Sequence, residues 1–220
     1  MKIDFRDILL SGIALITNLC YTYYNTQQND LLVNFRQQLA QKRQGGNMIK
    51  FPMSLFSSHT DFPVHLQYGH HSADDCYMHG HEDYFELVVV LDGRAEHMVV
   101  GDSYKISAGD VFVINTSTEH GFKSADGIKI CNIMFKPEIL ERMFNITETE
   151  GFQALFVLEP YFTQNHRFSG GLRLPPEVFV QVRAIIEQMM TEYTGGGEGL
   201  QTLVYADFMK LCVLLSANYR

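Results

Sequence analysis

Positive charge is scarce in this chain of 220 residues, in which 17 Lys and Arg stand against 25 Asp and Glu for a net charge of −8. Residues 1–47 contain five basic and only three acidic side chains, so the rest of the chain is its more acidic part. A surface of this charge repels phosphate groups. The chain by itself is therefore a poor candidate for binding DNA or an anionic membrane.

Closely spaced cysteines are also absent. The four cysteines form no CxxC pair: they are Cys20, Cys76, Cys131 and Cys212. This spacing argues against a zinc ribbon, a thioredoxin-like redox motif or a disulfide scaffold. Reduced thiols in a cytoplasmic protein are the simplest interpretation.

Long hydrophobic runs are missing as well. The longest apolar stretch, residues 8–24, is interrupted by Ser11, Thr17, Asn18 and Thr22, and acidic side chains precede it. It is too short and polar for a membrane span and too acidic at its front for a signal peptide. The chain also has no Rossmann glycine pattern, phosphate loop or nucleophile elbow.

Residues 1–47 differ in character from the rest of the chain. They end in LLVNFRQQLAQKRQGG, which predicts a short helix stopped by glycines. Codons for Gly45-Gly46-Asn47 can form a purine-rich ribosome-binding sequence just before Met48. Translation starting at Met48 and a genuine helical N-terminal extension are both open interpretations of this segment.

Residues 48–136 predict a β-unit. Short apolar runs alternate with turn signals at 92–93, 101–102, 108–110 and 126–127. The predicted strands are 64–68, 85–91, 95–100, 104–106, 111–114 and 128–135. Short strands with a turn every 8–12 residues are typical of a sandwich, a jelly roll or a small barrel.

Residues 137–220 predict helices on this β-unit. After a short helix at 137–144 and an irregular apolar connection from 151 to 174, Pro175-Pro176 opens a helix that ends at Gly195. A second amphipathic helix extends from Leu200 to Tyr219. The two apolar stripes are most simply core; their other interpretation is a dimer seam, in which Leu211 and Leu215 would lie.

The candidate site is set by MHGHEDYFELVVVLDG. His79 and His81 have the same strand parity, so both imidazoles project to one face. Glu86 has the opposite parity and joins them only if residues 82–84 bulge or turn, which would also bring Val88 and Val90 inward. His120 ends the stretch GDVFVINTSTEH and could return to the same place. Three imidazoles and one carboxylate suit one divalent transition metal ion, or hydrogen bonds to a polyhydroxylated ligand.

These spacings resemble the two cupin motifs. HxH, four residues, Glu, six residues and Gly is similar to the first motif, and Gly109 through His120 is similar to the second. Ala73 departs from the usual glycine of the first motif, and Asn115 and Ser117 from the Pro and Gly of the second. The resemblance implies a cupin, or double-stranded β-helix, barrel.

A more specific resemblance, over roughly residues 50–220, is to the N-terminal effector-binding domain of AraC-family transcription regulators, especially those resembling the rhamnose-operon regulators. HGHEDYFELVVVLDGRAEH, GDVFVINTSTEHGF and FKPEIL carry it, with GFQALFVLEPYF and RFSGGLRLPPE after them. It implies a barrel at 48–136 that binds a small effector, often a sugar, and a dimerising two-helix segment at 137–220. The helix-turn-helix domain that contacts DNA would come next, and it is absent from this chain.

The resemblance also implies an effector pocket, lined by His79, His81, Glu86, His120, Phe122 and Asn132. In it Phe122 could stack on a sugar ring and Asn132 could exchange hydrogen bonds with hydroxyls, although plain core packing explains either residue too. The competing interpretations are a metal-dependent cupin enzyme, either a dioxygenase or a sugar isomerase, and a structural cupin. The two-helix extension favours a non-enzymatic effector-binding domain.

Overall fold

The computed structural model describes residues 49–56, 62–71, 78–143, 145–165, 171–197 and 199–219. Nearly all of them belong to one compact unit, Lys50–Arg220. The predicted extension at 1–47 lies outside the described residues, as do Cys20 and Cys76.

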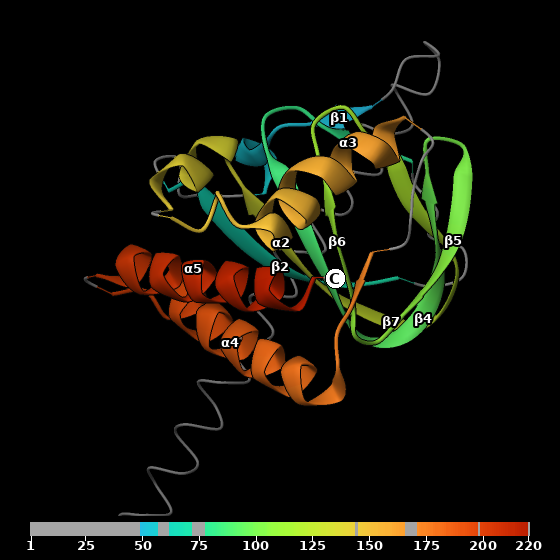
Figure 1. Cartoon of the computed structure of the whole chain (residues 1–220). Helices are drawn as coiled ribbons and strands as arrows, with labels where there is room; N and C mark the ends of the chain where they lie inside the picture. The colour runs from blue at the N-terminus through green and yellow to red at the C-terminus, as the bar shows by residue number, and fades with distance from the viewer. Residues whose placement is uncertain are drawn as a thin grey trace, which may run out of the picture. The chain divides into compact units, whose positions relative to one another are not determined.

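The unit is built on a six-stranded antiparallel sheet (Figure 1). Its strands run in the order β2-β7-β4-β6-β8, with β5 paired to β4. The bounds are β2 Val64–His70, β4 Phe85–Val99, β5 Asp102–Ser107, β6 Asp110–Ile114, β7 His120–Phe135 and β8 Leu172–Arg173. A separate parallel pair joins β1 (Lys50–Phe51) to β3 (Gly80–His81). The predicted class, mainly β with C-terminal helices, is confirmed.

Two predicted turns are in fact bulges inside long strands. Asp92-Gly93 lies within β4 and Asp126-Gly127 within β7, and the two strands stay paired across both sites with shifts of register. Gly93 has φ +69°, and a Cβ there would lie 2.3 Å from the carbonyl oxygen of Gly127. The Asp-Gly dipeptides thus supply the backbone freedom of a turn, but they bend a strand pair instead of ending it.

The bulges change which residues of β4 point inward. Before the bulges, Val88 and Val90 belong to the inner apolar cluster, as predicted. Beyond the bulges, Ala95 belongs to the same cluster. When the register of a strand shifts by an odd number of residues, the side chains beyond the shift point to the opposite face of the sheet. His97, which shares the parity of Ala95, is therefore turned into the interior, where it is fully buried.

Helices cover the other face of the sheet. α4 (Pro176–Gly195) and α5 (Leu200–Asn218) lie side by side, as Figure 1 shows. Both were predicted from their apolar spacing, and their buried residues join the outer sheet residues in one cluster. Leu211 and Leu215 are fully buried in it. The prediction that these two lie in a dimer seam is wrong, because this face of α5 packs on the protein's own core.

The connection at 151–174 was predicted to be irregular, and this too is wrong for its first half. It contains a helical run made of α2 (Glu150–Phe152), the π-helical η3 (Gln153–Leu158) and α3 (Glu159–Gln164). Pro160 looks like a helix breaker in the sequence, because it lacks an N–H and crowds the preceding turn. The wider π-helical turn just before it accommodates the proline, as such segments can.

Two shorter 3-10 helices complete the unit, η1 at Met53–Leu55 and η2 at Pro137–Arg142. η2 falls where a short helix was predicted. The helical run from α2 packs tightly on the end of α5: a Cβ on Gly151 would lie 1.9 Å from the Ser216 carbonyl oxygen. Close approach of two backbones therefore requires glycine at this position.

Candidate functional site

The histidine pair is held by backbone pairing at both ends. Within β3, His81 pairs with Phe51 of β1, and His79 forms an isolated bridge with His120 at the start of β7. The His79 and His120 backbones exchange hydrogen bonds of 2.8 and 2.9 Å. Segments about 40 residues apart in the sequence thus meet, and their imidazoles lie together.

Glu86 reaches the same place because the chain bends between β3 and β4. The bend at Glu82 and Asp83 is fixed by the Asp83 carboxylate, which accepts hydrogen bonds from the Met53 backbone N–H (2.8 Å) and from the Lys136 ammonium group. The turn that strand parity required at 82–84 is therefore present. It allows Glu86 to point inward with Val88.

The spacing of the donor atoms fits a metal ion. Ligand atoms of His79, His81 and His120 all lie within 4.8 Å of one another. His81 Nε2 and His120 Nε2 are 3.1 Å apart, and Glu86 Oε2 lies 3.8 and 3.7 Å from them. Donors that share one ion at about 2.0–2.2 Å are separated from each other by roughly 2.8–3.1 Å in octahedral and roughly 3.3–3.6 Å in tetrahedral geometry. Small side-chain movements would bring this set to ligand distances.

Burial keeps these groups uncharged. It lowers the pKa of His81 and of His120 well below the usual value for histidine, with neighbouring histidines adding to the effect. Burial also raises the pKa of Glu86 to about 8. Neutral imidazoles are the form that coordinates metals, and a bound cation would favour the ionised carboxylate. The electrostatics therefore fit a cation at this position.

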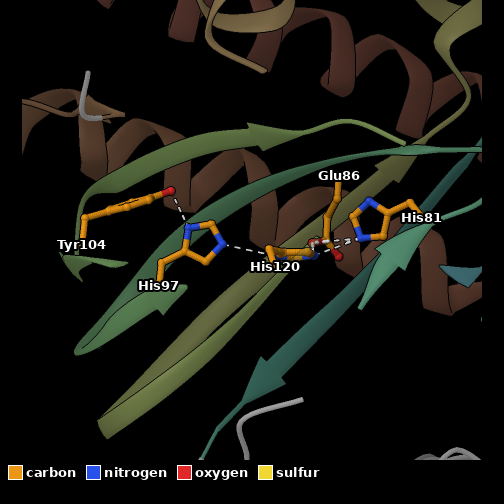
Figure 2. A network of polar contacts seen from close by, with 5 residues as sticks. All are labelled: His81, Glu86, His97, Tyr104 and His120. Carbon is orange, nitrogen blue, oxygen red and sulfur yellow. Dashed lines mark hydrogen bonds and ion pairs between the residues drawn. The ribbon is translucent and has the colours of Figure 1, made fainter. Parts of the chain in front are cut away.

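A fourth histidine, which is buried and which the sequence motifs did not identify, continues the cluster (Figure 2). His97 Nε2 lies 3.2 Å from His120 Nδ1, and His97 Nδ1 contacts the Tyr104 hydroxyl. Burial, together with His79, lowers the pKa of His97 to about 3. His97 lies beyond the Asp92-Gly93 bulge, so only knowledge of the register shift could have placed it here.

The two remaining predicted residues also lie on the inner face. Phe122 is buried and stacks on His97, with ring centroids 5.1 Å apart, and it also lies 4.8 Å from the ring of His71. Asn132 pairs with Val88 on the inner face. Its side-chain oxygen is buried with no hydrogen-bond partner among the described residues. Asn132 therefore has an acceptor available to a ligand.

Most side chains of the site are buried. His81, Glu86, His97 and His120 are at most 2% exposed. A surface hollow of about 400 Å³ lies elsewhere, lined by Phe62, Tyr193 and the turn between α4 and α5. It contains none of the predicted site residues, and among the three clustered histidines of the predicted site only His79 is partly exposed.

A β-domain with a mostly apolar interior and a few convergent buried polar groups is typical of small-ligand or metal-binding domains. The AraC-like ligand binding domain model matches residues 62–206 of this chain. The chain belongs to this family, as the motifs predicted.

Its curated relatives are transcription activators by name. The chain is 25% identical over 139 residues to the HTH-type transcriptional activator RhaR of Mannheimia succiniciproducens, covering 63% of this chain and 45% of that protein. It is 27% identical over 142 residues to RhaS of Escherichia fergusonii, covering 63% and 46%. The chain thus spans about half the length of the curated relatives it matches.

Solved structures with a similar arrangement include apo ToxT from Vibrio cholerae, at a TM-score of 0.42 and 12% identity over 67% of this chain and 54% of that one. A cupin protein from Bacteroides fragilis aligns with 34% of this chain and 67% of its own length, at a TM-score of 0.31 and 18% identity.

Proposed function

We propose that this chain is the effector-sensing part of an AraC-type transcription regulator. It binds a small polar ligand, a sugar, on the inner face of its β-domain and thereby controls a DNA-binding domain that would belong to a longer protein. The proposal is carried by the family match, together with the buried polar groups that converge on one point. Such a protein acts in the cytoplasm, where its DNA target lies.

Within this site, His79, His81, Glu86 and His120 would hold one divalent transition metal ion. A bound ion would offer open coordination positions to hydroxyl oxygens of the effector. Asn132 would accept a further hydrogen bond and Phe122 would pack on the apolar face of the ring. The family match to a ligand-binding domain favours this sensing role over a metal-dependent enzyme.

The proposed assembly is a homodimer through the outer face of α5. Five exposed residues recur there at alternating intervals of three and four: Leu203, Ala206, Lys210, Val213 and Ala217. This is the spacing of a coiled-coil seam. By length and composition α5 could also cross a membrane. The burial of Phe208, Leu211 and Leu215 in the core accounts for much of that hydropathy.

Thermal unfolding with a panel of hexoses, deoxyhexoses, pentoses and uronic acids tests effector binding. A sugar that binds only the folded chain should stabilise it by about 2.7 kcal/mol at a hundredfold excess over its dissociation constant. Mass spectrometry should recover that sugar unchanged. Asn132→Leu should weaken the shift, whereas Asn165→Leu, at an exposed position after α3, should not. If no sugar shifts the wild-type transition, the sugar assignment is wrong.

A further inference from the structure

The polar contacts at the candidate site extend beyond its four predicted ligands. His120 at the start of β7 contacts His97 of β4, and His97 contacts Tyr104 of β5 (Figure 2). These three side chains form a single line of contacts that leads away from His81 and Glu86. β4, which carries His97, pairs with both of the other strands.

Stacking fixes the plane of the His97 ring. Phe112 lies against it with ring centroids 4.4 Å apart at 25°, and Phe122 with centroids 5.1 Å apart at 26°. An imidazole held by stacked rings can direct its two nitrogens only along the ring plane. One nitrogen then faces His120 and the other faces Tyr104, so His97 is oriented by its packing before any ligand binds.

Hydrogen-bond logic links this orientation to the metal site. A neutral imidazole has one N–H and one acceptor nitrogen. When His120 Nδ1 donates to His97 Nε2, His97 must carry its own proton on Nδ1 and donate to the Tyr104 oxygen. His120 Nε2 then keeps its lone pair, directed towards His81 and Glu86. The opposite tautomer would place a proton on His120 Nε2, where a metal would have to bind.

We propose that His97 and Tyr104 are positioning residues, which hold His120 in the tautomer that presents Nε2 to the metal ion. This inference rests on the metal site of the proposed function. Partners that orient a ligating histidine typically change metal affinity by about 10–100-fold when they are removed. The residues that decide metal affinity would then include two that no metal-ligand motif contains.

Cobalt(II) titration of the purified chain, followed by its visible d–d absorption, measures the effect. His97→Phe keeps an aromatic ring but removes both nitrogens, and it should raise the dissociation constant by about 10–100-fold. Tyr104→Phe should raise it less, since only the end of the line of contacts is lost. Tyr205→Phe, on α5 and outside the line of contacts, is the matched control, because it removes a hydroxyl that has no hydrogen-bond partner among the described residues. It should bind cobalt as the wild type does.

Histidine side-chain ¹⁵N–¹H correlation spectra give a readout that a purely structural role would not change. In the wild type His120 should be protonated on Nδ1, and His97→Phe should remove that preference. Should His97→Phe fail to fold by circular dichroism, Tyr104→Phe carries both measurements.

The cobalt measurements distinguish failure of the metal site from failure of the positioning role. A wild-type chain that binds no cobalt would overturn the metal site and this inference with it. Wild-type binding with unchanged affinity in both His97→Phe and Tyr104→Phe would overturn the positioning role alone. A changed cobalt spectrum at saturation in His97→Phe would make His97 a ligand, which also contradicts the positioning role.

Discussion

Glu159 makes the stability of this fold depend on pH. Its side chain is 3% exposed, and neither carboxylate oxygen has a hydrogen-bond partner among the described residues. Burial raises its pKa to about 8, from 4.5 in the unfolded chain. A raised folded-state pKa means that the folded chain binds the proton more tightly. The associated stability is present in full below about pH 4.5 and is lost as the pH rises through about 8.

Glu159→Gln should therefore stabilise the chain at high pH. The neutral amide avoids the cost of a buried charge, so we expect a gain on the order of 1–3 kcal/mol at pH 8 and little change at pH 5. Urea unfolding at both pH values measures this. Glu150→Gln, at an exposed position in the same helical run, is the control. The pKa of Glu86 is also raised, but its effect on stability is the same in the wild type and in both variants, so it cancels in the comparison. A gain independent of pH would contradict the raised pKa of Glu159.

Residue types and spacing predicted His79, His81, Glu86 and His120, and the structure brings these four together. They did not predict His97, Tyr104 or Glu159. The motif residues are recognisable because each of the two motifs is a short stretch with its own fixed spacing. Contacts such as that between His97 and His120 depend on the register of two strands, which a single sequence does not specify.

At the scale of elements, the bend in the β4–β7 pair requires glycine at position 93. Gly93→Ala combines a left-handed backbone conformation with a clash against Gly127. Gly101→Ala, in a turn at φ +88°, has nothing within 4 Å of its added Cβ. Gly101→Ala is the control and should lower the free energy of unfolding by about 1–2 kcal/mol, which is the penalty of the left-handed conformation alone. Gly93→Ala should cost clearly more in urea unfolding, and equal losses would mean that the close approach is relieved without cost.

The same bend marks the limit of what apolar periodicity predicts about strands and helices. Most strand positions and both long C-terminal helices could be predicted from apolar periodicity, because each buries one face. The Asp-Gly pairs were misassigned because their local preference for turns was taken to end a strand, and residues 151–174 were predicted to be irregular although a helical run occupies their first half. Tertiary pairing instead continued the strands through Gly93 and Gly127, and the helical run through Pro160.

At the scale of the whole molecule, the proposed dimer depends on exposed residues of α5. Leu203 and Val213 are 52% and 53% exposed, whereas Leu211 on the opposite face is fully buried. Leu203→Glu with Val213→Glu would place four charges across a symmetric seam and should shift the chain to monomers that remain folded. Light scattering and circular dichroism measure this. Leu211→Lys should instead unfold the chain.

A wild-type chain that is monomeric at tens of micromolar would contradict the dimer proposal and leave the β-domain unaffected. A dimer that persists in the double variant would place the seam elsewhere on the molecule.

The four predicted ligands differ in how extensively their backbone segments are paired. Glu86 and His120 lie on long strands that are paired along most of their length, whereas His79 and His81 lie in and beside the two-residue β3, paired only with β1 and with His120 among the described residues. Short pairings open at much lower cost than a continuous strand pair. Ligand exchange would then proceed by brief detachment of β3, at a rate independent of global unfolding. Phe51, whose ring lies 5.7 Å from that of His79, would set the residence time of whatever the site holds.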